Sequence, residues 1–220
     1  KVDCLQNVHV QGSDSKEGQE IVAPQTRFDS PHWAIAASVG QSEILTSRQP
    51  RIDVVSTGDE VVALDSTPEN HQIRRSNPSA IHASLLQSGF RDVYLHHVSD
   101  CKALLYKSLV GLIDVSDFLI ITGGVSAGKF DYVPTVLADL KIKKIFHKVR
   151  QKPGKPLWFG ISGTGMPIFG LPGNPVSTLV SLHRYVIPAL KKATGNVGES
   201  KTGYARLTEN ICFNKQMTLF

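Results

Sequence analysis

The chain has 220 residues, of which 41% are hydrophobic and 20% are charged, the balance of a globular protein. It contains no run of about 18 apolar residues and no secretory signal near its start, so we expect a cytoplasmic protein with no membrane partner. The net charge of +5 favours anionic ligands, but the lysines and arginines are scattered, so we expect a small phosphorylated or oxyanion substrate rather than nucleic acid.

Strands and helices alternate along most of the chain. Residues 1–47 are polar and turn-rich, apart from one predicted helix over 31–39. The predicted strands cover residues 52–57, 93–98, 117–122, 145–149, 157–159 and 168–169. The predicted helices begin at Asn77-Pro78 and cover residues near 104–112, 133–140 and 176–192. From about Tyr204 the pattern becomes short and β-like.

This alternation predicts an α/β fold, a doubly wound and mostly parallel sheet with helices on both faces and partial flanking β segments. We divide the chain into a remnant of a flanking domain over 1–47, the α/β domain over 48–195, and the start of a C-terminal β domain over 196–220. Ligands of such sheets bind beyond the carboxyl ends of the strands. The segments that follow strands are therefore the candidates for a functional site.

Two predicted strands lead directly into segments suited to a charged ligand. After the first strand, Gly58 permits a sharp turn, and the adjacent carboxylates of Asp59 and Glu60 suit Mg²⁺, which prefers oxygen ligands; a solvated acidic turn is the alternative. After the third strand, residues 123–131 read Gly-Gly-Val-Ser-Ala-Gly-Lys-Phe-Asp, in which the glycines allow the backbone to approach an anion closely. A tight strand-to-helix turn explains this segment equally well, and Asp131 suits either a helix cap or a metal ligand.

Two later segments also suit an anion. Residues 152–156 read Lys-Pro-Gly-Lys-Pro, a stiff loop in which two lysines converge as point charges for a compact oxyanion; a basic surface turn is the alternative. Residues 170–177 read Gly-Leu-Pro-Gly-Asn-Pro-Val-Ser and open a helix whose first turn holds Ser177. Free N–H groups in a first helical turn favour an anion, and capping by Asn174 or Ser177 is compatible with that interpretation.

Five motifs occur in a fixed order over this part of the chain. They are Thr-Gly-Asp-Glu at 57–60, Ser-Asn at 76–77, Gly-Gly-Val-Ser-x-Gly-x-x-Asp at 123–131, Pro-Gly-Lys-Pro at 153–156, and Leu-Pro-Gly-Asn-Pro-Val-Ser at 171–177. In this order the chain resembles the molybdopterin molybdenumtransferases, or molybdenum insertases, a family that includes the MoeA proteins and the gephyrin E domain. The resemblance is tightest from Arg51 to Gly195.

The resemblance implies a reaction of molybdenum cofactor biosynthesis. Members of this family bind adenylylated molybdopterin, use Mg²⁺ and molybdate, insert molybdenum and release AMP. They are homodimers of several domains, and an adenylyltransferase upstream in the synthesis would supply their substrate. The fold that the resemblance implies is the molybdopterin-binding α/β domain, over residues 48–195.

The resemblance also assigns roles to residues of this chain. Asp59 and Glu60 would hold the metal and, with Asp131, would be catalytic. Molybdate would be bound by Lys152, Lys155, Pro156 and Ser177. The adenylylated substrate would be bound by Thr57, Gly58, Ser76, Asn77, Gly123, Gly124, Val125, Ser126, Gly128, Pro172, Gly173 and Asn174.

Two positions depart from the family pattern, and two other functions stay open. Arg75 stands where the family usually has Asp, and Lys129 stands where an acidic residue is common, so the usual metal arrangement is in question. One alternative is a molybdopterin adenylyltransferase, against which Val125-Ser126 and the Pro-Gly-Lys-Pro loop argue. The other is a non-catalytic scaffold that binds a pterin or nucleotide.

Overall fold

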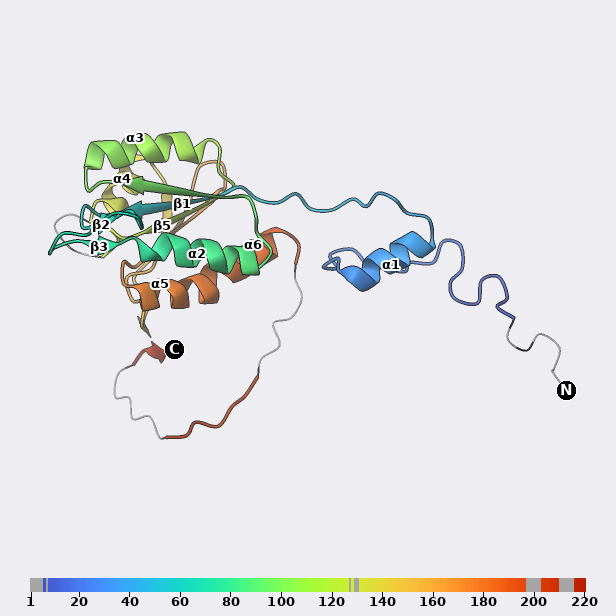
Figure 1. Cartoon of the computed structure of the whole chain (residues 1–220). Coiled ribbons are helices and arrows are strands. Elements are labelled where there is room, and N and C mark those ends of the chain that lie inside the picture. Colours follow the sequence, from blue (N-terminus) through green and yellow to red (C-terminus); the bar gives the residue numbers. More distant parts are fainter. Residues whose placement is uncertain (1–5, 7, 127, 129–130, 197–202, 210–215) are drawn as a thin grey trace. The chain divides into compact units, whose positions relative to one another are not determined.

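The computed structural model describes residues 6, 8–126, 128, 131–196, 203–209 and 216–220 (Figure 1). The chain forms two compact units, Lys1–Ser47 with Gly195–Gly203, and Arg48–Thr194 with Tyr204–Phe220. The first unit contains α1 (Ser30–Ser38). None of the helices in the described ranges is long and apolar enough to cross a membrane. That residues 1–47, 48–195 and 196–220 belong to three different domains stays a prediction.

The second unit is built on a six-stranded sheet with the order β4-β1-β5-β9-β8-β6. Its strands are β1 (Ile52–Thr57), β4 (Val93–Val98), β5 (Phe118–Thr122), β6 (Lys143–His147), β8 (Trp158–Ile161) and β9 (Pro167–Leu171). The first four strands in the sheet order are parallel, whereas β8 is antiparallel to both of its neighbours. The predicted α/β fold with a mostly parallel sheet is thereby confirmed.

Helices cover both faces of this sheet (Figure 1). One face carries α3 (Lys102–Ile113) and α4 (Val133–Asp139), and the other carries α2 (Ser76–Gln87), α5 (Pro175–Ser181) and α6 (Ile187–Ala193). A π-helical turn over Leu182–Val186 joins α5 to α6, where the sequence predicted one regular helix. Side chains alternate along β1, so that Val55 joins the core under α3 and α4 while Ile52 and Val54 join the core under α2.

Two short parallel ladders lie outside the sheet. β2 (Val61–Val62) pairs with β3 (Ile73–Arg74), which brings the chain back toward β1 before α2 begins. β7 (Gln151–Lys152) pairs with β10 (Thr218–Leu219), and both strands belong to the second unit.

A buried carboxylate ties the sheet together at the start of β1. Asp53 is fully buried, and its oxygens accept hydrogen bonds from Arg51 Nε at 3.0 Å and Ser116 Oγ at 2.8 Å. His96 Nε2 lies 2.7 Å from the other oxygen. Burial alone would raise the pKa of Asp53, but these three partners outweigh it and hold that pKa below its usual value. Asp53 is therefore charged and paired at neutral pH.

The carboxyl ends of four strands meet at one edge of the sheet. Thr57 lies beside Val98 of β4, Ser56 lies beside Thr122 of β5, and Thr122 lies beside Leu171 of β9. The chain leaves β1 toward β4 on one side and then crosses to β5 on the other side. This reversal beside β1 is the topological switch point at which sheets of this type bind their ligands.

Candidate functional site

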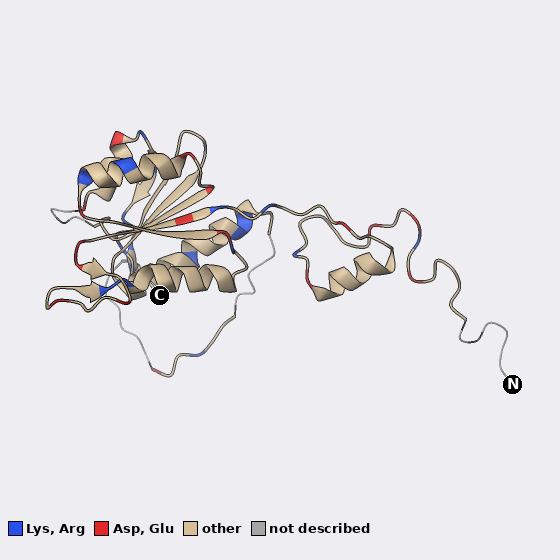
Figure 2. Cartoon of the chain, turned by 45° about the horizontal axis from the view of Figure 1, so that its top comes forward, with Lys and Arg blue, Asp and Glu red and all other residues tan. Residues whose placement is uncertain are grey.

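A cavity of about 160 Å³ opens at this switch point. Its walls come from the segments that follow β1, β4 and β5: Thr57, Gly58, Glu60, Asp100, Gly124, Gly128 and Asp131. Lysines, arginines and acidic residues are interspersed over the rest of the unit (Figure 2). Three carboxylates in one cavity of a chain with a net charge of +5 are therefore a local feature, not part of a generally acidic surface.

The structure gives the two carboxylates after β1 different neighbours. Asp59 Oδ1 accepts a hydrogen bond from the backbone N–H of Asp100 at 3.1 Å and so holds the loop after β4. Glu60 lines the cavity, and its Oε2 lies 2.6 Å from where a β-carbon on Gly58 would stand. Glu60 therefore faces the cavity directly, whereas Asp59 supports the neighbouring loop.

The glycine-rich segment after β5 packs closely on the end of β1. A β-carbon on Gly123 would lie 2.8 Å from the Thr57 carbonyl oxygen, and one on Gly124 would lie 2.9 Å from Thr57 Oγ1. The segment closes on itself, because Asp131 Oδ2 accepts a hydrogen bond from the N–H of Gly128 at 2.5 Å. One carboxylate oxygen of Asp131 thus fixes the loop in a position that forms the cavity wall.

Val125 and Ser126 have different surroundings within the same segment. The side chain of Val125 is buried in the core, and its carbonyl oxygen lies 2.9 Å from His147 Nε2. Ser126 is exposed. A substrate at this loop would therefore meet the hydroxyl of Ser126 but not the side chain of Val125. Lys129, which departs from the family pattern, lies outside the described residues.

Asn77, at the start of α2, is bonded both to the end of β5 and to the loop after β9. Its Nδ2 donates to Thr122 Oγ1 at 3.0 Å and to the Gly173 carbonyl oxygen at 2.7 Å. Thr122 Oγ1 lies 3.4 Å from the Pro172 carbonyl oxygen and donates to it. Asn77 thus fixes the end of β5 and the loop after β9 in one arrangement, while Ser76 beside it is exposed.

We predict that Asn77→Ala lowers the free energy of unfolding by about 1–2 kcal/mol, because both hydrogen bonds are lost and Gly173 and Thr122 lose a donor. Urea denaturation followed by far-ultraviolet circular dichroism measures this loss. Gln87→Ala, at an exposed position near the end of the same helix, is the matched control and should change stability by less than about 0.5 kcal/mol. Equal stability of the two variants would show that the Asn77 bridge contributes nothing.

The basic loop over 152–156 lies against α5. Its N-terminal side is fixed by Gln151, whose Nε2 donates to the carbonyl oxygens of Pro153 at 3.1 Å and Gly154 at 3.3 Å. Gly154 fits closely there, since a β-carbon would lie 2.8 Å from Ser181 Oγ and 3.4 Å from the Ser177 carbonyl oxygen. Lys152 and Lys155 are both exposed, and Pro156 is half-buried between Lys155 and the fully buried Leu157. The structure therefore brings the predicted molybdate loop next to Ser177.

Asn174 caps the start of α5. Its Oδ1 accepts hydrogen bonds from the N–H groups of Val176 at 3.1 Å and Ser177 at 3.3 Å. These two N–H groups are thus already bonded within the protein, as the capping interpretation expected. The Ser177 hydroxyl, half-buried beside the basic loop, is the group at this position that is suited to contact an anion.

Asp100 is a residue of the cavity that the sequence motifs did not reveal. It follows β4 by two residues and lines the cavity with Glu60 and Asp131. Burial is the largest cause that raises its pKa, the hydrogen bond to Asp59 opposes it, and the charges of Glu60, Asp59 and Asp131 raise it further. The one available signal was its place just beyond a strand that a parallel sheet brings beside β1.

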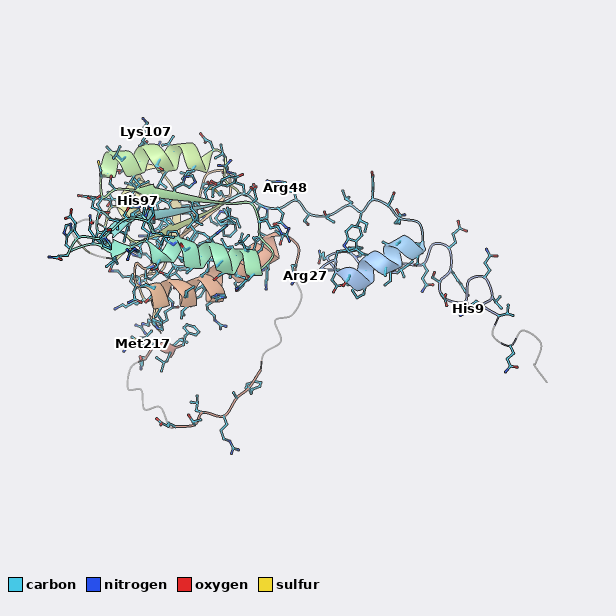
Figure 3. The ribbon with its side chains drawn as sticks, in the orientation of Figure 1. His9, Arg27, Arg48, His97, Lys107 and Met217 are labelled. Atoms are coloured by element: carbon cyan, nitrogen blue, oxygen red, sulfur yellow. The ribbon has the colours of Figure 1, made fainter. Side chains whose placement is uncertain are left out.

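Arg75 lines a different hollow, of about 280 Å³, on the face covered by α2. Ser56 and His97 line the same hollow, and Ser56 Oγ lies 3.1 Å from His97 Nδ1. Partial burial lowers the pKa of His97, and the charge of Arg75 lowers it further. Figure 3 shows His97 at the opposite end of the sheet from Arg48. Arg75 therefore places a positive charge near the ligand-binding edge of the sheet, on the face opposite to the one that Thr57 faces.

The carboxylates of the cavity suit a hydrated divalent cation. Within the described ranges, no group of three or more His, Cys, Asp or Glu side chains is close enough to hold a metal ion by itself. Mg²⁺ usually keeps several waters and takes only one or two carboxylates together with the phosphates of a substrate. Glu60 and Asp131 meet that requirement, because both line the cavity and both are free of ion pairs within the described ranges.

Comparisons with known proteins agree with these motifs. The family described as "Probable molybdopterin binding domain" matches residues 53–192. The chain is 39% identical to a molybdopterin molybdenumtransferase of Synechocystis over 97% of this chain and 52% of that protein. It is 34% identical to one of Nostoc over 86% of this chain and 44% of that protein. The chain thus spans about half the length of the curated relatives it matches.

A solved structure agrees with the fold. The crystal structure of a molybdopterin biosynthesis MoeA protein from Pyrococcus horikoshii superposes with a TM-score of 0.74 at 28% identity, over 84% of this chain and 46% of that chain. The resemblance inferred from the five motifs is confirmed. The chain belongs to the family of molybdopterin-binding domains, and it is similar in sequence to the molybdopterin molybdenumtransferases within that family.

Proposed function

We propose that this chain provides the catalytic α/β domain of a molybdenum insertase, which transfers molybdate to adenylylated molybdopterin with release of AMP. The observation that carries the proposal is the convergence of the family's glycine-rich loop and acidic turn on one cavity at the switch point of the sheet. The relatives named molybdopterin molybdenumtransferase support the same reaction.

The glycine-rich loop and Asn77 would bind and orient the adenylylated substrate. Gly123 would hold the loop against the end of β1. Gly124 lines the cavity and would place the loop backbone beside a phosphate group, and Ser126 would offer an exposed hydroxyl. Lys152, Lys155 and Ser177 would hold molybdate, because two lysine charges and a hydroxyl lie in or beside one stiff loop. The two anions would thereby be held at the same edge of the sheet.

Glu60 and Asp131 would hold Mg²⁺ through its waters at the diphosphate of the substrate, with Asp59 as the support of the adjacent loop. When bound there, Mg²⁺ would neutralise the negative charge that develops on the leaving phosphate. Asp131 would keep one oxygen on the N–H of Gly128 and direct the other toward the anhydride and the attacking water. We further propose that the protein acts as a homodimer in the cytoplasm and receives its substrate from an adenylyltransferase.

Neither alternative function has a specific observation in its favour. The adenylyltransferase interpretation is not supported by the sequence relatives, which are named molybdenumtransferases. The scaffold interpretation predicts a protein that folds and binds the substrate without releasing AMP, so a test of turnover after binding separates it from the insertase.

The test is equilibrium binding of adenylylated molybdopterin to the chain, with and without Mg²⁺, for the wild type and Asp131→Asn. Asparagine keeps an oxygen that can accept the Gly128 hydrogen bond but removes the charge. We expect Asp131→Asn to weaken binding about tenfold with Mg²⁺ and to leave it equal or tighter without Mg²⁺, because the uncompensated carboxylate then repels the diphosphate.

Lys155→Ala tests the molybdate loop in the same assay. It should weaken the binding of molybdate about tenfold and leave the adenylylated substrate unaffected, whereas Lys192→Ala, an exposed lysine of α6, is the control and should change neither. A well-folded wild type that binds neither ligand would contradict the proposed function. Binding of both ligands without release of AMP would favour the scaffold.

A further inference from the structure

A buried polar side chain, that of Gln151, lies at the start of the basic loop over 152–156. Gln151 is only 1% exposed, and its backbone is held in place by the pairing of β7 with β10. A side-chain amide has two N–H donors and one carbonyl acceptor, and a buried amide costs free energy unless these groups are bonded. The partners of Gln151 therefore show what this residue does.

Both ends of the Gln151 amide are used. Its Nε2 donates to the carbonyl oxygens of Pro153 at 3.1 Å and Gly154 at 3.3 Å, while its Oε1 accepts a hydrogen bond from the hydroxyl of Tyr185. The reverse orientation of the amide would set Oε1 against two carbonyl oxygens, which have no hydrogen to donate. The hydrogen bond from Tyr185 thus favours the orientation in which the N–H donors face the loop.

The position of Tyr185 depends on the π-helical turn over Leu182–Val186. Such a turn is wider than an α-helical turn, because its hydrogen bonds span one more residue, and single π turns within helices are frequent at functional sites. Another hydroxyl beside the loop, that of Ser181, is buried without a hydrogen-bond partner in the described part of the chain. Ser181 therefore does not take over the role of Gln151 as donor to the loop.

The bonds of Gln151 also set the direction of two backbone N–H groups. In a trans peptide the C=O and the following N–H point in opposite directions, and the peptide bonds on both sides of Gly154 are trans. Because Gln151 binds the carbonyl oxygens of Pro153 and Gly154, the N–H groups of Gly154 and Lys155 point away from it. Neither N–H donates to an acceptor within the described ranges. Successive N–H groups with a shared direction can form a concave site for an anion.

We propose that Gln151 and Tyr185 are positioning residues for the basic loop. Tyr185 orients the amide of Gln151, and Gln151 orients the N–H groups of Gly154 and Lys155 toward a tetrahedral oxyanion. Donors that are held in advance need no reorganisation when the anion arrives, whereas the exposed side chain of Lys155 loses rotamer freedom. The inference rests on the proposed function, in which the oxyanion is molybdate, but it concerns this loop alone and is measurable without any pterin.

The test is a titration of the isotope-labelled whole chain with molybdate, followed by the backbone N–H signals in nuclear magnetic resonance spectra. The signals of Gly154 and Lys155 should move downfield in the wild type, since their hydrogens are then donated to an oxyanion. Gln151→Met has a similar size but no donor. It should weaken molybdate binding about tenfold and abolish the downfield shift of both signals.

Tyr185→Phe tests the second positioning residue, because it keeps the aromatic ring and removes the hydroxyl that orients Gln151. Molybdate binding should weaken about threefold, since the amide can then turn its oxygen toward the loop. Tyr106→Phe removes the same group from an exposed position on α3 and should leave the affinity unchanged. Tyr185→Phe also decides the question if Gln151→Met does not fold.

A control of equal stability separates positioning from a structural role. Gln151→Met also lowers stability, because two buried carbonyl groups and a hydroxyl lose their partner. Ser116→Ala lowers stability as well, because it removes a hydrogen bond to Asp53, before the start of β5. At a temperature where circular dichroism shows every variant to be folded, Ser116→Ala should bind molybdate like the wild type.

Several outcomes would overturn the inference. These are an unchanged molybdate affinity in Gln151→Met and Tyr185→Phe, a loss of affinity that Ser116→Ala shares, and molybdate binding that leaves the signals of Gly154 and Lys155 in place. Release of AMP by a protein with any of these results would leave the proposed function standing. Inorganic phosphate that binds the loop in place of molybdate, with the same dependence on Gln151, would support the inference and reject the proposed function. A wild type that binds neither anion would overturn both.

Discussion

Gly123→Ala should lower the free energy of unfolding by about 3 kcal/mol. Gly123 has a φ of 92°, a conformation that costs a residue with a β-carbon about 1–2 kcal/mol. The added β-carbon would also lie 2.8 Å from the Thr57 carbonyl oxygen, which belongs to the backbone of β1. Because β1 is a central strand that is buried along its whole length, it cannot shift easily to relieve this contact, and overpacking adds about 1–2 kcal/mol.

Two other glycines of the chain separate these causes. Gly89 has a similar φ of 94° but open space around it, so Gly89→Ala should show the conformational cost of about 1 kcal/mol alone. Gly111 lies inside α3 with nothing within 4 Å, so Gly111→Ala should stabilise the protein by about 0.5–1 kcal/mol. Urea denaturation followed by the fluorescence of buried Trp158 measures all three. If Gly123→Ala costs no more than Gly89→Ala, the close packing on Thr57 is not rigid.

Asp53→Ala should lower the free energy of unfolding by about 3 kcal/mol at pH 7, the lower end of the range for breaking a buried charge pair. The substitution removes the acceptor of Arg51, His96 and Ser116 at once. The arginine and histidine side chains are 34% and 32% exposed, so both can regain water, and this keeps the loss from being larger.

The effect of Asp53 should also depend on pH in a defined direction. Its pKa in the folded protein is below the usual value of 3.8, so the charge stabilises the fold above that value. The difference in stability between the wild type and Asp53→Asn should be constant from pH 7 to about pH 5 and shrink as the pH falls below about 4. Asp139→Asn, which breaks an ion pair with Lys102 at the surface, is the comparison and should cost less than about 1 kcal/mol. A difference for Asp53→Asn that grows at low pH would refute this account.

Three strands of the sheet could be predicted closely, whereas β6 begins two residues before its predicted start and β9 is three residues longer than predicted. β1 and β4 have the predicted bounds, and β5 differs from its predicted bounds by one residue. All six residues of β1 are buried, which explains why the sequence indicates this strand clearly. Periodicity did not reveal the π-helical turn over Leu182–Val186, because the same apolar spacing suits either helix type at this length.

The site could be predicted in part. The motifs identified the segments that follow β1, β5 and β9, since parallel strands bring their carboxyl ends to one edge. Spacing alone does not show which way the side chains after Gly58 point. The sequence therefore predicts that Asp59 and Glu60 share one metal site. In the structure Glu60 lines the cavity, whereas Asp59 accepts a hydrogen bond from the loop after β4. Asp100 was not found because its contribution depends on the pairing of β4 with β1 across residues far apart in the chain.

Side chains at the end of β1 point alternately to the two faces of the sheet, and this limits where residues can be inserted into or deleted from the chain. Ser56 and Thr57 are neighbours in the chain, yet they line hollows on opposite faces of the sheet. Inserting or deleting one residue within β1 would exchange the faces of every later side chain of the strand and spoil both hollows together. Natural insertions among the relatives should therefore fall in the connection between β2 and β3, where residues can be added without turning the strand over.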